Sequence, residues 1–271
     1  MMLTVLIIIG LILLFVIPSI LVYFLQHKII FAPHHHKRRG LFKEYPERYR
    51  PLELQVEKGI FLEGVVYEPE TKAEVTMLYF GGREQDSVTL VGKFSLHYPK
   101  VRIIAYNYRA YGKSGGVPSE ASFHGDALKI YDDVLKNYAK PVVLGYSLGS
   151  NVATYISVRR EPKALILVAA FESVHALSLA KLRPVPRFFL RHRFETINEI
   201  DKVQTPFSLF VSVDDGFVPI SQPRKLKEKA KNMVKYKEYD GYNHAQILFS
   251  DEVCEEVSMI LDVQDNKILE K

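Results

Sequence analysis

The segment GYSLG at positions 145–149 has the residue types and spacing of a serine nucleophile. It follows the apolar run at 141–144 and precedes a stretch with helical spacing, so Ser147 is expected on a sharp strand-to-helix turn. The glycines two residues to either side are required because a side chain there would collide with the neighbouring strand and helix. The start of the following helix also favours developing negative charge. Ser147 is therefore the predicted nucleophile.

A serine hydroxyl is a weak nucleophile and needs a general base that is itself oriented by a carboxylate. DDGFVP (214–219) follows the strand-like run FSLFVSV, and GYNH (241–244) follows the run VKYKEY. Since ligands of parallel sheets bind beyond the carboxyl ends of the strands, Asp215 and His244 are predicted to meet Ser147 there. Asp214 is the neighbouring candidate. Alternatively, Asp215 is a turn residue and His244 a surface histidine, but their order and spacing weigh against this.

An acyl-transfer site also needs donors for the oxyanion. The backbone N–H of Leu148, next after the nucleophile, is one expected donor. The loop FGGR (80–83) after an apolar run supplies the second, and we expect it to be Gly82, with Arg83 as the fallback. This chemistry requires no metal and no cofactor.

The elements that position these residues alternate along the chain. Two alternating runs around Lys58-Gly59 predict an antiparallel hairpin. Buried strands are expected at 75–80, 101–106, 142–144, 164–169, 207–213 and 234–239, and helices at 120–138, 148–160, 220–231 and 245–260. This alternation predicts one α/β domain over 51–271 with a mostly parallel sheet flanked by helices. The segment at about 171–200 breaks the rhythm and is expected to form a small cap.

The combination of motifs resembles a known family. NYRAYGKSGGVPSE (107–120) is similar to the D-Y-R-G-Y-G-x-S-x-G-x-P-S-E segment of α/β-hydrolase domain-containing proteins, specifically their membrane-anchored Bem-type branch. LQHKIIFAP, GYSLGS, DDGFVP and GYNHAQ match it as well. The resemblance implies the α/β-hydrolase fold, a serine hydrolase of esters or thioesters, and Asp215 rather than Asp214 as the acid. Some members of this family remove fatty acyl groups from proteins.

Three positions depart from the family pattern. Phe80-Gly81 replaces the usual His-Gly of the oxyanion loop, Asn107 replaces an Asp, and Ala110 replaces a Gly. The first change leaves open how the oxyanion loop is braced, and hence which group is the second donor. The other residues of the motif, Tyr106, Tyr108, Arg109 and Tyr111, are interpreted as structural.

The N-terminal end predicts a membrane anchor. Residues 1–27 hold no Asp, Glu, Lys or Arg and are almost continuously apolar from Met2 to Leu25, long enough to cross a bilayer. They have neither the basic start nor the cleavage site of a signal peptide, so a retained single-pass helix is expected. Residues 28–50, interpreted as a linker, hold seven basic residues against two acidic ones, a net of +5 that equals that of the whole chain. This cluster predicts a cytoplasmic domain.

The remaining features of the sequence are its basic excess, a run of histidines, a single cysteine and a basic cap. The basic excess is explained by the linker, so it does not indicate nucleic-acid binding. His34-His35-His36 is interpreted as a solvated segment rather than a metal site, and the single Cys254 excludes an intramolecular disulfide. The cap carries basic residues around Phe188 and Phe189, which is either an ordinary solvated face or a surface that rests on anionic lipid.

The sequence therefore predicts a membrane-anchored serine hydrolase of carboxylic esters or thioesters, with acyl-lipid or acyl-protein substrates. A peptidase or amidase with the same triad, and a membrane scaffold with a degenerate pocket, are the alternatives. The presence of Ser147, Asp215 and His244 together argues against the scaffold.

Overall fold

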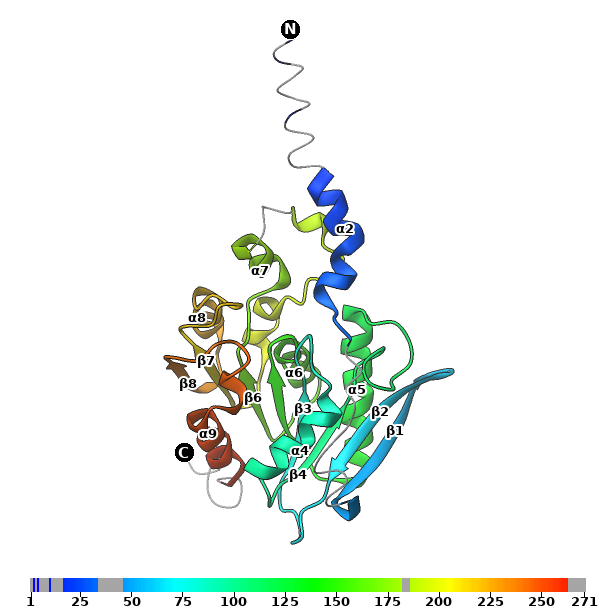
Figure 1. Cartoon of the computed structure of the whole chain (residues 1–271). Coiled ribbons are helices and arrows are strands. Elements are labelled where there is room, and N and C mark those ends of the chain that lie inside the picture. Colours follow the sequence, from blue (N-terminus) through cyan, green and yellow to red (C-terminus); the bar gives the residue numbers. More distant parts are fainter. Residues whose placement is uncertain are drawn as a thin grey trace.

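One mixed sheet forms the centre of the molecule. The computed structural model describes Met2, Thr4, Gly10 and residues 17–33, 46–181 and 186–262. Within these residues eight strands form a sheet in the order β1-β2-β4-β3-β5-β6-β7-β8 (Figure 1). The strands are β1 (Tyr49–Glu57), β2 (Ile60–Tyr67), β3 (Thr76–Phe80), β4 (Arg102–Tyr106), β5 (Val142–Tyr146), β6 (Ala164–Val168), β7 (Phe207–Ser212) and β8 (Met233–Tyr239).

The strand directions agree with the prediction of a hairpin followed by a parallel sheet. β1 and β2 pair antiparallel, and β2 is antiparallel to β4. From β4 through β3 to β8 all neighbouring strands are parallel. The carboxyl ends of these parallel strands therefore lie along one edge, where the predicted catalytic residues follow β3, β5, β7 and β8.

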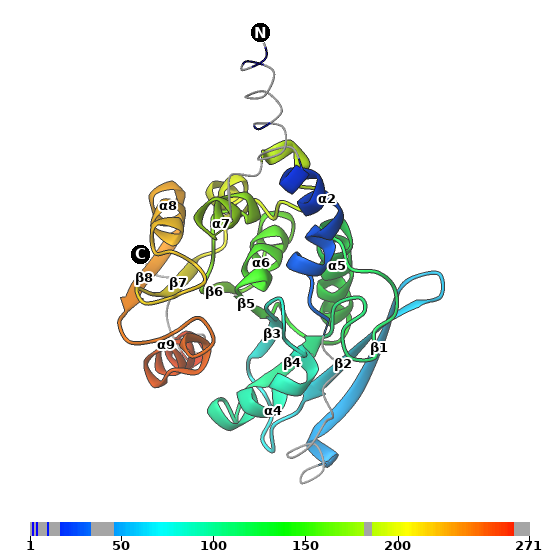
Figure 2. The ribbon, with the colours of Figure 1, turned by 45° about the horizontal axis from the view of Figure 1, so that its top comes forward.

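Helices cover both faces of the sheet (Figures 1 and 2). These are α4 (Ser87–His97), α5 (Glu120–Asn137), α6 (Leu148–Arg159), α8 (Ser221–Lys229) and α9 (Asp251–Asp262), whereas α2 (Ile17–Ile30) and α7 (Val174–Lys181) lie beyond the ends of the strands. Side chains alternate along β3: Leu78 and Phe80 join the core on the side of α5, α6 and α8, whereas Met77 and Tyr79 join the core on the side of α4 and α9. Because both faces are covered, β3, β5, β6 and β7 are buried throughout, whereas the edge strand β8 carries Lys235, Lys237 and Glu238.

Two helices differ from the sequence prediction. α4 was not expected, and it begins where the Asp86 carboxylate accepts the backbone N–H of Thr89 at 3.1 Å. The last helix was expected from 245 but begins at Asp251. Its start is delayed because Asn243 Oδ1 accepts the N–H groups of Ala245 and Gln246, each at 3.0 Å, which forms a turn after the histidine.

The segment between β6 and β7 lies beyond the carboxyl ends of the strands, as expected for a cap. It contains α7 and three short 3-10 turns, η3 (Arg187–Phe189), η4 (Thr196–Asn198) and η5 (Ile200–Lys202). Leu190 and Phe194 are buried, whereas Phe188 is exposed. Buried apolar side chains such as Leu190 and Phe194 therefore hold the cap against the domain.

The N-terminal segment is more closely integrated than a linker. Apart from residues 2, 4, 10 and 17–27, the expected anchor lies outside the described residues, as do residues 34–45 with the three consecutive histidines. No helix of the described ranges combines the length and the apolar character that a bilayer span needs. α2 continues to Ile30, and Ile30 and Phe31 are buried in the core, while β1 begins at Tyr49. The expected domain start at residue 51 therefore omits residues that pack on the domain, because a pattern of apolar residues does not show what they pack against.

Candidate active site

Ser147 stands on a strained turn between β5 and α6. Its φ of 52° and ψ of −117° lie in a region that L residues rarely adopt. A Cβ on Gly149 would lie 2.1 Å from the carbonyl oxygen of Phe80, and a Cβ on Gly145 would lie 2.4 Å from the carbonyl oxygen of Gly149. Both glycines are therefore required by close backbone approach, as the sequence indicated. The turn lifts the hydroxyl above the sheet.

The predicted catalytic residues come together at this turn. His244 Nε2 lies 2.9 Å from Ser147 Oγ, and His244 Nδ1 lies 2.6 Å from Asp215 Oδ2. The other oxygen of Asp215 accepts the backbone N–H groups of Phe217 at 2.7 Å and Val218 at 2.8 Å. The Asp215 side chain is only 2 % exposed. Two backbone donors and burial fix the carboxylate, which in turn fixes the imidazole.

Asp214 has a different role from Asp215. Its Oδ2 accepts the backbone N–H of Gly241 at 2.6 Å, so it braces the loop that leads to the histidine. Ser212 supports the same loop, since its hydroxyl donates to the carbonyl of Tyr242 at 2.5 Å. The geometry thus favours Asp215 over Asp214 as the residue that orients the imidazole.

Tyr146 is a site residue that the sequence did not single out, because it occupies the variable position of the GYSLG pattern. Its hydroxyl donates to the backbone carbonyl of His244 at 2.6 Å. Burial, and then the charge of Asp215, raise the pKa of this phenol far above its usual value. Tyr146 therefore stays a neutral donor and ties the nucleophile turn to the histidine loop. The ring of Phe217 lies 4.9 Å from the imidazole, centre to centre.

The expected oxyanion donors lie next to the nucleophile but differ in their hydrogen bonding. Leu148 begins α6, so its N–H has no partner within the helix. The N–H of Gly82 donates to Gln85 Oε1 at 2.8 Å, and the same oxygen accepts the hydroxyl of Tyr79. Arg83 lines the cavity above Ser147, and among the hydrogen bonds of the described residues none uses its backbone N–H. In this conformation Gln85 occupies the N–H of Gly82, the expected second donor, whereas the N–H of Arg83, the fallback, stays open within the described residues.

The motif tyrosines brace this loop in place of a histidine at position 80. The hydroxyl of Tyr108 donates to the carbonyl of Gly81 at 3.1 Å, and that of Tyr111 donates to the carbonyl of Arg83 at 2.7 Å. Phe80 is buried in the apolar core. The loop is therefore held through its carbonyl groups, which leaves its N–H groups for other partners.

Of the two other departures, Asn107 suits its surroundings, whereas Ala110 does not relieve its backbone. Asn107 donates to Asp86 Oδ1 at 2.8 Å and to Glu63 Oε2 at 3.2 Å. An Asp at this position would face two carboxylates, so the neutral amide suits its surroundings better. Ala110 has a φ of 67°, the left-handed region that favours Gly. This position therefore carries some backbone strain.

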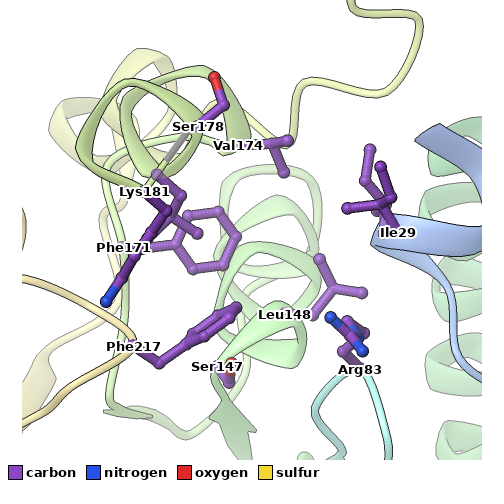
Figure 3. A pocket seen from close by; sticks show the side chains of 11 residues that line it. Ile29, Arg83, Ser147, Leu148, Phe171, Val174, Ser178, Lys181 and Phe217 are labelled. Carbon is purple, nitrogen blue, oxygen red and sulfur yellow. The ribbon is translucent and has the colours of Figure 1, made fainter. Parts of the chain in front are cut away.

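A cavity of about 140 Å³ opens above the nucleophile (Figure 3). Ser147 and Leu148 lie at its floor, and its walls are mostly apolar. The lining residues are Ile29, Ile30, Arg83, Ser147, Leu148, Phe171, Val174, Leu177, Ser178, Lys181 and Phe217. The cap supplies one wall through α7, as expected, but α2 supplies the opposite wall, which the sequence did not indicate. Within the described residues no group of three His, Cys, Asp or Glu side chains could hold a metal ion.

The chain shares its fold and the order of its elements with solved α/β hydrolases. Esterase Pf2001 of Pyrococcus furiosus superposes with a TM-score of 0.67 at 18 % identity, covering 86 % of this chain and 97 % of the esterase. An α/β hydrolase of Vibrio vulnificus superposes with a TM-score of 0.65 at 17 % identity, covering 82 % and 87 % of the two chains. At such identities the likeness shows the fold alone.

Curated relatives match only part of the chain. Lysophosphatidylserine lipase ABHD12 of Danio rerio is 31 % identical over 151 residues, which are 47 % of this chain and 39 % of the lipase. An uncharacterized protein of Mycobacterium tuberculosis is 29 % identical over 158 residues, 55 % of each chain. The chain thus spans about half the length of the curated relatives it matches. No protein-family model matches it.

Proposed function

We propose that this chain is a serine hydrolase that cleaves carboxylic esters or thioesters of lipid character. Ser147 is the nucleophile, His244 the general base and Asp215 the acid that orients it. One observation carries the proposal: a hydroxyl, an imidazole and a carboxylate are joined at 2.9 and 2.6 Å, and the hydroxyl lies at the floor of a mostly apolar cavity. The partial similarity to the Danio rerio lysophosphatidylserine lipase supports the same class of substrate.

In the acylation step, Ser147 Oγ forms a bond to the carbonyl carbon while His244 Nε2 accepts the serine proton. The carbonyl electron pair moves to its oxygen, and backbone N–H groups stabilise this oxyanion. These are the N–H of Leu148 and one from the loop at Gly82 and Arg83. When the intermediate collapses, the bond to the alcohol or thiol breaks, and His244 gives its proton to the leaving oxygen or sulfur.

Water completes the cycle by the reverse path. His244 accepts a proton from water as the water oxygen bonds to the acyl carbon of the acyl-enzyme. The bond to Ser147 Oγ then breaks, the serine regains a proton from His244, and the carboxylic acid leaves. Asp215 keeps its charge throughout and stabilises the imidazolium that forms in both steps.

The substrate class is proposed from the cavity and from the surfaces beside it. The cavity walls are apolar, which favours an acyl chain over a charged group. Ile20, Phe24 and Leu25 of α2 and Phe188 of the cap are exposed apolar side chains on the segments that flank the cavity. Together with the apolar sequence of residues 1–27, they support a membrane-anchored enzyme that takes acyl lipids or acylated proteins at a bilayer surface.

The nucleophile is tested with a fluorophosphonate that reacts with activated serines. The full-length chain should be labelled, and Ser147→Ala should abolish the labelling. Ser178→Ala is the matched control, because Ser178 lines the same cavity but its hydroxyl donates to the carbonyl of His175 at 2.8 Å and has no base beside it. Labelling that persists in Ser147→Ala, or disappears in Ser178→Ala with the fold intact, would contradict the assignment.

The orientation is tested separately. The basic residues after the predicted anchor support a cytoplasmic orientation of the domain. A reporter that works only in the cytoplasm should therefore be active when fused after Lys271. Activity of an export-only reporter at that position would instead place the domain on the other side of the membrane.

A further inference from the structure

The helix that precedes the hydrolase domain forms part of the cavity. Ile29 and Ile30, at the end of α2, line the same space as Ser147 (Figure 3). They face Val174 and Leu177 of α7 across it. Two segments far apart in the sequence, α2 and α7, therefore both contribute walls to the cavity above the nucleophile.

α2 is fixed in this position by specific contacts. The Gln26 side chain is 2 % exposed and donates to the carbonyl of Phe189 at 3.1 Å, while its oxygen accepts the N–H of Arg191 at 2.6 Å. One turn further on, the buried Phe31 ring packs edge-on against Phe123, with centres 5.2 Å apart. A buried amide with both ends bonded is costly to displace, so α2 is a stable wall of the cavity.

The size of the cavity limits what it encloses. At about 140 Å³ it is close to the roughly 150 Å³ of an apolar protein cavity that holds benzene, so it accommodates about six carbons. A longer acyl chain must leave the cavity through its opening. Ile29 and Phe217 line the cavity and are 43 % and 39 % exposed, so both lie at its rim, Ile29 on the side of α2.

An apolar path continues from Ile29 along α2. Leu25 lies four residues earlier, hence on the same side of the helix, and is partly exposed. We propose that Ile29 controls the exit of the acyl pocket, and that an acyl chain longer than about six carbons passes Ile29 and lies along α2 beside Leu25. α2 then sets the chain-length preference of the enzyme. This inference rests on the proposed ester hydrolysis at Ser147.

Substitution of Ile29 tests the inference in the full-length chain in detergent. The readout is the ratio of kcat/KM for a dodecanoyl ester of p-nitrophenol to that for the butanoyl ester. Ile29→Phe narrows the exit, so kcat/KM for the dodecanoyl ester should fall by about tenfold or more relative to that for the butanoyl ester, which the cavity encloses. Ile29→Ala opens the exit and should not lower the ratio.

Ile20→Phe is the matched control. Ile20 is the same residue type on the same helix, it is 44 % exposed, and it does not line the cavity. Its substitution should leave the ratio unchanged. An unchanged ratio in Ile29→Phe, or an equal fall for both esters, would overturn the inference while leaving ester hydrolysis intact. Failure of the unsubstituted chain to hydrolyse either ester would overturn the proposed function and the inference with it.

Discussion

Replacement of Asp215 by Asn changes the tautomer of the catalytic histidine. One carboxylate oxygen accepts the N–H groups of Phe217 and Val218, so the amide oxygen of an Asn must take this place. The amide –NH₂ then occupies the position 2.6 Å from His244 Nδ1 and donates to it. The ring proton is thereby held on Nε2, which faces Ser147 Oγ and can no longer accept its proton.

The expected loss is about 10⁴-fold in kcat, the magnitude of the same change in another serine-hydrolase triad, and it corresponds to about 5.4 kcal/mol in the barrier. Asp215→Asn should slow both the hydrolysis of a butanoyl ester and the reaction of Ser147 with a fluorophosphonate. The fold should persist, because both backbone hydrogen bonds are kept. Circular dichroism and the thermal midpoint check this requirement.

Asp214→Asn is the control for this substitution. Asp214 accepts only the N–H of Gly241 among the hydrogen bonds of the described residues, and an Asn oxygen can do the same. We expect its activity to fall by less than about tenfold, since only the charge assistance of one hydrogen bond is lost. A folded Asp215→Asn that retains more than a tenth of the activity, or a larger loss in Asp214→Asn, would refute the tautomer reasoning.

Three further predictions concern packing and charge. Gly149→Ala places a Cβ 2.1 Å from a backbone carbonyl oxygen, so it should destabilise the fold by about 1–3 kcal/mol or more and slow fluorophosphonate labelling; an unchanged thermal midpoint would contradict this. Asp126→Asn removes the bidentate partner of the mostly buried Arg109 guanidinium and leaves it paired with Glu57 alone. Urea unfolding should therefore show a loss of about 1–3 kcal/mol, against about 0.5 kcal/mol for Asp133→Asn, whose partner Lys136 is exposed. Burial lowers the pKa of His124, because the buried ring favours its neutral form. The stability that the neutral ring contributes is complete above the unfolded pKa of about 6.5, and it is lost as the pH falls through the lower folded pKa. His124→Asn should therefore reduce the fall in thermal midpoint between about pH 8 and pH 5, and an equal fall in both proteins would contradict it.

The strands and the catalytic residues were the most predictable parts of the molecule. Short runs alternating with helical spacing predicted each of the parallel strands to within a few residues. The central strands are apolar because both of their faces are buried, and the edge strand β8 alternates. The GYSLG pattern and the order of Ser147, Asp215 and His244 predicted which side chains the geometry brings together. By contrast, α4 was missed, since Val88, Thr89, Val91 and a mid-helix Gly92 give it a weak helical signal.

The sequence by itself determined the class of fold and the chemistry of the nucleophile, because both depend on residue types and on spacings along the chain. Only the tertiary structure placed Gln85 on the N–H of Gly82, tied Tyr146 to the histidine loop, and made Ile29 a wall of the cavity above Ser147. These contacts join residues from separate segments, and hydrophobic periodicity reports which face of an element is buried but not what lies against it. Packing between separate segments therefore decided which residues surround Ser147.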